Sequence, residues 1–325
     1  MHSTVDVKLS RGRPILRYLG IGLLIALLLL LWPVPEMSRL FRYSMDLLHA
    51  PFFALFAFLL DQKWRRHQKG ESYTLFFFWI LLLILAIGLE AAQSWVDRNS
   101  NWRDGLANLL GITAGILFSF SCVTAKKNHK WLSLLFAILL IITGSLYGIR
   151  GIWDTLQARH DFPILADFES ADELLRWQSR EAHLAQSRQH ATTGNFSGRL
   201  ALGIGRYPGV SIELPANDWS AYQWLELDIV WPNKNDSSPI PHTAPKTLAL
   251  RIKLEDEGPN NSIDDRFEST ILLHSGKNRI QIPLAEITNG PVNRLLCLDA
   301  MSTLSLFVTN LKNPQTLFID RIRLE

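Results

Sequence analysis

Long apolar segments in the first half of the chain constrain its fold more than any other feature. A helix crosses a bilayer with about 20 mainly apolar residues. Four segments meet or approach that length: Ile15–Trp32, Tyr73–Ala92, Gly105–Ala125 and Trp131–Trp153. A fifth, Leu47–Leu60, is long enough only if it extends back to about Phe41; as it stands, it also fits a re-entrant or interfacial helix. The pattern favours an α-helical transmembrane bundle with five spans within residues 15–153.

The Lys and Arg residues between these segments predict how the chain is oriented. Cytoplasmic loops of membrane proteins carry an excess of both residue types. The N-terminal segment and the loops 63–69 and 126–130 together hold 11 of them, whereas the alternate side holds five. We therefore expect residues 1–14 in the cytoplasm and everything after the fifth span outside. In a Gram-negative cell this means an inner-membrane protein with a periplasmic C-terminal domain.

Charge and cysteine content separate the two halves of the chain. Residues 1–150 hold 16 Lys and Arg against 8 Asp and Glu, whereas residues 151–325 hold 17 against 22. An acidic second half argues against a nucleic-acid partner. Cys122 and Cys297 lie in different halves and are not expected to pair, so the second half must be stabilised by its core.

Short segments with alternating apolar and polar residues fill the second half and predict strands. They cover residues 199–204, 224–229, 248–253, 278–283 and 304–308, separated by loops rich in Pro, Asn, Asp, Ser and Gly. This spacing predicts an all-β jelly roll or β-sandwich over residues 166–325, joined to the spans by a linker over 154–165. Only Asp172–Arg188 is expected to be helical.

Polar residues inside the apolar segments occur in pairs at helical spacing. The pairs are Asp46 with His49, Glu90 with Gln93, and Asp104 with Asn108. Residues three or four apart share a helix face, and the predicted topology places all three pairs near the outer membrane surface, with Arg98 in the adjoining loop. Ionisable groups in a membrane usually face the bundle interior or a water-filled cavity. We therefore expect these seven residues to form an outward-facing ligand site.

The alternative for this polar layer is an interfacial rim that contacts headgroups and caps helices. Asp104, for example, also fits a helix N-cap. Within the expected site, Asp46 would orient the His49 imidazole, and His49, Asp46 and Glu90 are the candidates for any catalysis. Gly111 and Gly115 continue the Asn108 face and would let a neighbouring helix approach closely.

The order of these polar residues, followed by Gly111, resembles the VanZ-like family of membrane proteins over roughly Met37 to Ala125. The chain departs from the family at Leu47, where members often have Lys. The resemblance implies a link to glycopeptide antibiotic resistance, but the family's biochemical activity is poorly defined, so it implies no mechanism.

The second half resembles galactose-binding-like jelly rolls, including carbohydrate-binding modules and the complex I intermediate-associated protein family. The matching segments are Asp167–Glu169, Asp218–Leu225 and Ile319–Leu324. The resemblance implies glycan binding on exposed aromatic rings with flanking polar groups. The candidates are Tyr207, Trp219, Tyr222, Trp231 and Arg266. Core or strand-edge packing fits Trp219 and Tyr222 equally well, and Trp224 is expected in the core.

Related modules often bind calcium, and the carboxylates of Asp167, Glu169 and Asp320 would suit Ca²⁺ if the first and last strands are adjacent. A salt bridge from Asp320 to Arg321 or Arg323 fits the same residues. No other cofactor is expected.

Three functions are compatible with this pattern. The preferred one is a non-enzymatic envelope protein that binds a membrane lipid or lipid-linked envelope precursor in the helical half and a glycan in the β-domain. The second is a membrane-embedded enzyme that acts on such a lipid through Asp46, His49 and Glu90. The third is a transporter, against which five spans and the lack of a visible inverted repeat both count. The sequence has no nucleotide-binding Gly-rich loop, zinc signature or nucleophile elbow that singles out a reaction.

Overall fold

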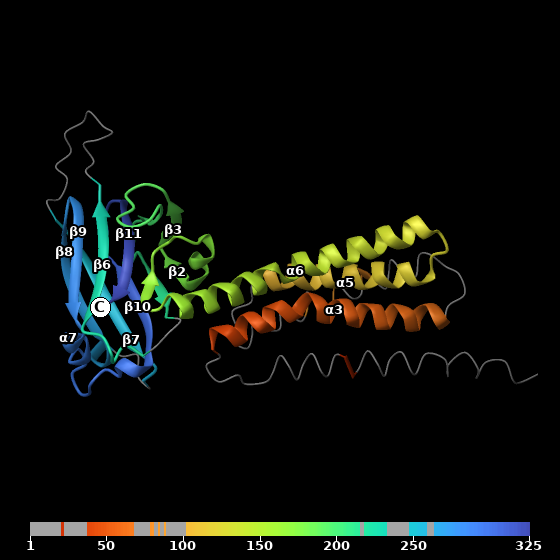
Figure 1. Ribbon diagram of the computed structural model, residues 1–325, viewed down its shortest axis with the longest axis horizontal. Helices are drawn as coiled ribbons and strands as arrows, with labels where there is room; N and C mark the ends of the chain where they lie inside the picture. Colours follow the sequence, from red (N-terminus) through yellow and green to blue (C-terminus); the bar gives the residue numbers. More distant parts are fainter. Residues whose placement is uncertain are drawn as a thin grey trace, which may run out of the picture. The chain divides into compact units, whose positions relative to one another are not determined.

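The computed structural model describes residues 21–22, 38–67, 79–80, 84, 88, 102–214, 218–232, 247–258 and 263–325. The chain forms two compact units, Met1–Ile152 and Trp153–Glu325. Figure 1 shows the helices of the first unit and the sheets of the second. Each unit is described by itself below.

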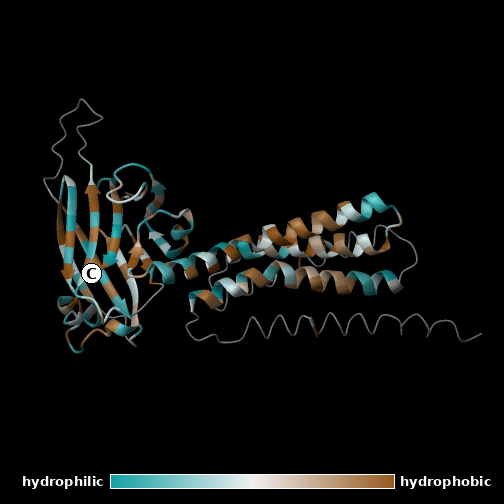
Figure 2. Ribbon diagram, in the orientation of Figure 1, coloured by the Kyte–Doolittle hydropathy of each residue, from teal (hydrophilic) through white to brown (hydrophobic). Residues whose placement is uncertain are grey.

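The helical unit contains the helices α3 (Arg39–His67), α5 (Trp102–Val123) and α6 (Lys127–Asp161), of which α6 continues into the second unit. All three are long and apolar enough to cross a membrane, and Figure 2 shows the hydrophobic residues along them. They lie at the second, fourth and fifth expected spans, and α3 begins before Phe41, as the longer form of the second requires. The first and third expected spans lie almost entirely outside the described residues.

Small residues let α3 and α5 pack closely. A Cβ atom at Gly111 would overlap the carbonyl oxygen of Ala50, and one at Gly115 would overlap that of Ala54. Such contacts are typical of membrane helix pairs, in which dispersion contacts rather than the hydrophobic effect drive association. The expected role of Gly111 and Gly115 is therefore confirmed.

Serine hydroxyls connect α6 to the other two helices. Ser145 Oγ donates to the Leu47 carbonyl of α3 at 3.1 Å, and Ser133 Oγ donates to the Leu117 carbonyl of α5 at 2.6 Å. A Cβ atom at Gly144 would lie 2.7 Å from the Ala50 Cβ. The three helices thus form one bundle.

The second unit is a sandwich of two antiparallel sheets, as the sequence predicts. Its strands are β1 (Ile164–Ala166), β2 (Trp177–Arg180), β3 (Ala182–Ser187), β4 (Ser197–Leu202), β5 (Gly209–Glu213), β6 (Trp224–Trp231), β7 (Thr247–Asp256), β8 (Phe267–His274), β9 (Gly276–Pro283), β10 (Met301–Phe307) and β11 (Gln315–Leu324). The first sheet has the order β3-β4-β11-β6-β9, with β1 also paired to β11, and the second has the order β2-β5-β10-β7-β8. A short helix, α7 (Leu284–Thr288), follows β9.

Alternating side chains fill the space between the sheets. In β7, Leu248, Leu250, Ile252 and Leu254 are buried and their neighbours are more exposed. Figure 2 shows the corresponding alternation of hydrophobic and hydrophilic residues along the strands. Burial of one face of each strand stabilises the sandwich by roughly 25 cal/mol for each Å² of apolar surface removed from water.

The start of this unit contains regular elements. Within residues 154–165, expected as a linker, α6 continues to Asp161 and β1 begins at Ile164. One expectation here is wrong. The expected helix over Asp172–Arg188 is instead a 3₁₀ helix, η1 (Ala171–Arg176), followed by β2 and β3. β2 and β3 lie in different sheets, and Glu181 between them has a φ of 49°.

A buried ion pair fixes η1 within the second unit. Arg176 Nη2 lies 2.9 Å from Asp154 Oδ1, and Arg176 Nε donates to both oxygens of the same carboxylate at 3.1 Å. Arg176 Nη1 also donates to the Leu165 carbonyl at 3.1 Å. A guanidinium that binds a carboxylate through two of its nitrogens is held in one orientation.

Candidate functional site

Four of the predicted polar residues converge between α3 and α5, and we call them the Asp46 cluster: Asp46, His49, Asp104 and Asn108. One carboxylate oxygen each of Asp46 and Asp104 and one ring nitrogen of His49 lie within 4.8 Å of one another. His49 Nδ1 lies 3.0 Å from Asn108 Oδ1. Two of the three predicted residue pairs, one from α3 and one from α5, therefore lie next to each other.

The close helix packing explains this convergence. Asp46 and His49 lie one turn apart on α3, as do Asp104 and Asn108 on α5. Gly111, three residues after Asn108, meets the α3 backbone at Ala50, one residue after His49. The contact that brings the backbones together is thus adjacent to the polar side chains, and Asn108 is only 2% exposed.

The hydrogen bond to Asn108 determines the chemistry of the His49 ring. The Asn108 amide oxygen accepts, so Nδ1 carries the proton and donates it. In a neutral imidazole the lone pair then lies on Nε2, which can bind a proton or a metal ion. Asp46 and Asp104 each have a further interaction partner, so neither carboxylate is isolated.

Aromatic and basic residues that the sequence did not single out join the helices near this level. The Arg103 guanidinium lies 4.5 Å from the centre of the Tyr147 ring of α6, and this ring lies 5.6 Å from that of Tyr43. Tyr43 precedes Asp46 by three residues, which is the spacing that identified the other pairs. Tyr147 had no such signal, because its place depends on how α6 packs.

The remaining members of the predicted ligand site lie outside the described residues. These are Glu90, Gln93 and Arg98. Their participation stays a prediction from helical spacing and loop position.

The aromatic candidates for glycan binding divide into buried and exposed rings. Trp219 is 0% exposed and Trp231 is 5% exposed, so both are core residues rather than surface platforms. Tyr222 is partly buried, with its ring 5.5 Å from that of Phe162. Trp224 was expected in the core, but it is 40% exposed. It begins β6, whose inward positions belong to Leu225 and the residues that alternate with it.

Tyr207 is exposed and Arg266 is partly buried, and both have charged neighbours. The guanidinium groups of Arg206 and Arg180 lie 5.2 and 6.0 Å from the centre of the Tyr207 ring. Arg266 Nη2 donates to Glu268 Oε2 at 2.7 Å, which commits that nitrogen to an ion pair. Tyr207 is therefore the most accessible ring among the sequence candidates.

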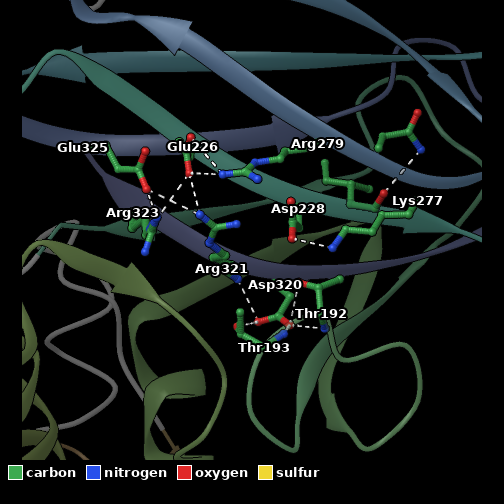
Figure 3. A network of polar contacts seen from close by, with 12 residues as sticks. Thr192, Thr193, Glu226, Asp228, Lys277, Arg279, Asp320, Arg321, Arg323 and Glu325 are labelled. Carbon is green, nitrogen blue, oxygen red and sulfur yellow. Dashed lines mark hydrogen bonds and ion pairs between the residues drawn. The ribbon is translucent and has the colours of Figure 1, made fainter.

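A charged surface that the sequence did not reveal covers the outer side of the first sheet (Figure 3). We call it the β6–β9–β11 face, and its residues labelled in Figure 3 are Glu226, Asp228, Lys277, Arg279, Arg321, Arg323 and Glu325. It also includes Gln281, which donates to Glu226, and Trp224, which lies two residues before Glu226 on β6. These residues come from strands that are paired in the sheet but distant in sequence. Periodicity within one strand could not have identified them as a set.

Glu226 is the centre of this face. Its carboxylate lies 2.8 Å from Arg321 Nη2, 3.1 Å from Arg279 Nη2 and 3.6 Å from Arg323 Nε, and Gln281 donates to it. Burial acts to raise the pKa of Glu226, but the hydrogen bonds from Gln281 and Arg279 and the two nearby arginine charges hold it below its ordinary value. Asp228 is paired with Lys277 at 3.1 Å. The face thus presents fixed charges beside the exposed ring of Trp224.

The proposed calcium ligands have other partners. Asp320 Oδ2 accepts from the backbone N–H of Thr192 at 2.6 Å and of Thr193 at 2.9 Å. Glu169 Oε1 accepts from two backbone N–H groups of the same loop. The carboxylates of Asp320 and Glu169 thus hold the loop before β4 through its backbone N–H groups, and calcium binding stays a prediction. Among the described residues, Arg321 and Arg323 form ion pairs with Glu226 and Glu325 rather than with Asp320.

A neighbouring carboxyl group is protonated more readily than usual. Burial raises the pKa of Glu173 to about 8. The positive charge of Arg176 opposes this rise, and the negative charge of Asp167 adds to it. One of its oxygens accepts from the Phe168 backbone N–H at 2.8 Å. The sequence offered no sign of this, because Glu173 lies in the segment expected to form a helix.

Comparison with known proteins found likeness only in solved structures. No protein-family model and no curated protein matches the chain, so the VanZ-like resemblance gains no support. A family 11 carbohydrate-binding module from Clostridium thermocellum, in complex with a β-1,3-1,4-mixed-linked tetrasaccharide, is 20% identical and has a TM-score of 0.37; the match covers 50% of this chain and 93% of that one.

Two further structures show likeness at a similar level. A family 30 carbohydrate-binding module of a Clostridium thermocellum cellulosomal cellulase is 15% identical with a TM-score of 0.34, covering 46% of this chain and 91% of that one. An exo-β-agarase is 15% identical with a TM-score of 0.37, and the match covers 50% of this chain and 25% of that one. The sugar ligands named belong to those proteins.

Proposed function

We propose that this chain is a non-enzymatic inner-membrane protein of the cell envelope that binds a lipid-linked or amphiphilic ligand. The convergence of Asp46, His49 and Asp104 within 4.8 Å, between two apolar helices, carries the proposal. Ionisable groups are costly in a membrane and are typically found where they face a ligand path or cavity. The N-terminus lies in the cytoplasm and the β-sandwich in the periplasm, in keeping with the Lys and Arg distribution.

The β-sandwich adds recognition of a glycan in this proposal. Trp224 supplies an exposed ring for the C–H face of a sugar. Arg279 and Arg323, which the buried Glu226 carboxylate holds in place, supply hydrogen-bond donors on the same face. Ring stacking with fixed polar groups around it is the usual basis of sugar recognition. The β6–β9–β11 face therefore replaces Trp219 and Trp231 as the glycan surface.

A catalytic role is the second candidate, and the His49–Asn108 hydrogen bond favours it. A neutral His49 with its lone pair on Nε2 is suited to act as a general base, and two carboxylates lie beside it. Turnover of a bound lipid by the wild-type protein but not by the His49→Ala variant would select this function over simple binding.

Loss of the His49 imidazole should release the ligand. We expect the His49→Ala and Asp104→Asn variants, purified in detergent, to retain about tenfold less co-purifying lipid than the wild type, as measured by mass spectrometry. His129→Ala is the matched control, because His129 is an exposed residue near the start of α6. Equal lipid content in all four proteins would contradict the site. If the ligand is a cell-wall precursor, resistance to glycopeptides is the phenotype to measure.

Removing the exposed ring of Trp224 should abolish glycan binding. On a glycan array, we expect hits for the full-length protein in detergent that weaken about tenfold or more in the Trp224→Ala variant. Tyr207→Ala is the comparison, because it removes an exposed ring from a different part of the sandwich. Loss of binding in Tyr207→Ala with none in Trp224→Ala would overturn the assignment to the β6–β9–β11 face.

A further inference from the structure

The donor atoms of the Asp46 cluster point to a metal ion. Within the part of the chain that the structure describes, side chains of the metal-binding types Asp, Asp and His converge there from two helices. One imidazole nitrogen and two carboxylate oxygens are a donor set used by Zn²⁺ and by other first-row divalent metals. Mg²⁺ and Ca²⁺ prefer oxygen ligands alone, so the imidazole favours a transition metal.

The spacing of these atoms is compatible with a shared ion. Ligands at about 2.1 Å from a tetrahedral metal lie roughly 3.4 Å from each other. The donor atoms lie within 4.8 Å of one another, and all three side chains are only partly buried.

Asn108 orients the histidine of this donor set. Metal-binding histidines commonly donate the N–H of their other ring nitrogen to an oxygen acceptor, which fixes the tautomer and the orientation of the ring. The buried Asn108 amide accepts from His49 Nδ1 at 3.0 Å, which leaves Nε2 with the lone pair. An acceptor at this position prepares His49 to bind a cation through Nε2.

Charge is compatible with the site. A carboxylate pair and an imidazole can bind a divalent ion together. Coordination positions that the protein leaves open on such an ion would take an oxygen of an anionic headgroup.

We propose that Asp46, His49 and Asp104 bind one divalent transition-metal ion, positioned by Asn108, which holds the anionic headgroup of the ligand. The metal site stands on its own geometry, whereas the headgroup contact rests on the proposed function.

The test uses the full chain, carrying an affinity tag without histidines, in detergent and stripped with EDTA. Titration with Zn²⁺ should show one bound ion per chain, and elemental analysis should confirm it. The Asp46→Asn, His49→Ala and Asp104→Asn variants should each bind at least about tenfold more weakly, and Asn108→Ala about 10–100-fold more weakly. His129→Ala should bind like the wild type.

Three outcomes separate this proposal from the function on which it builds. Absence of bound Zn²⁺ in well-folded wild-type protein, or equal binding by all variants, overturns the metal site. If lipid retention still depends on His49 in that case, the ligand site stands without a metal. If Zn²⁺ binds but EDTA leaves lipid retention unchanged, the metal site stands and the headgroup contact is overturned.

Discussion

Replacing Gly111 with alanine should force α3 and α5 apart and abolish ligand retention. The added Cβ would overlap the Ala50 carbonyl oxygen, a backbone atom that cannot rotate away as a side chain can. Overpacking of this kind costs about 1–3 kcal/mol, and separation of the helices would also pull Asn108 from His49. The measurements are thermal unfolding in detergent and the lipid content of the purified protein.

Gly105 provides a matched control in the same helix. A Cβ atom at Gly105 meets nothing within 4 Å in the described structure, so Gly105→Ala should be neutral or stabilise α5 by up to about 1 kcal/mol. Equal behaviour of Gly105→Ala and Gly111→Ala would show that close packing of the two helices does not maintain the site.

Replacing Arg176 with methionine should destabilise the β-sandwich by about 3–5 kcal/mol. The substitution keeps most of the apolar stem but leaves the buried Asp154 carboxylate without its guanidinium, and the Leu165 carbonyl without a donor. The measurement is hydrogen exchange of the core-strand amides in the full-length protein, with β5 and β10 as reporters.

An exposed ion pair in the same unit is the control for this variant. Arg251, which pairs with Glu268, is 40% exposed in its side chain, so Arg251→Ala should change stability by less than about 1 kcal/mol. The double variant Asp154→Leu with Arg176→Met should recover much of the loss, because a buried pair can often be replaced by apolar residues. Protection in Arg176→Met equal to that of the wild type would refute the structural role of the pair.

The Asp46 cluster could be predicted because helical spacing is fixed by backbone geometry. Asp46 and His49 lie one helical turn apart, and so do Asp104 and Asn108. The remaining unknown was whether these two helices pack against each other. Gly111 indicated which face of α5 would pack closely. The contact with Tyr147 could not be foreseen, since it depends on the rotation of α6 about its own axis.

The β-sandwich was predicted as a fold but not as a surface. Leu225 and Leu227 determine which side of β6 faces inward, and this alternation makes Trp224 an outward residue despite its apolar ring. Glu226 is buried because residues on the neighbouring strands β9 and β11 surround it, and the sequence of β6 alone does not reveal these neighbours.

The mistaken helix over Asp172–Arg188 had a different cause. The chain turns from the second sheet into the first at Glu181, which adopts a positive φ that is usual for glycine or asparagine. Glutamate gives no turn signal, so two short strands were merged into one apparent helix.

The position of β11 sets an order for the synthesis and folding of the sandwich. β11 pairs with β4 on one side and β6 on the other, and it is the strand that joins the β3–β4 and β6–β9 halves of the first sheet. The ribosome makes all of these partners before β11. Until then β4 and β6 each present an open edge, which invites pairing with other chains. We therefore expect a nascent sandwich to keep these edges open for longer than a sheet whose neighbouring strands follow one another in sequence.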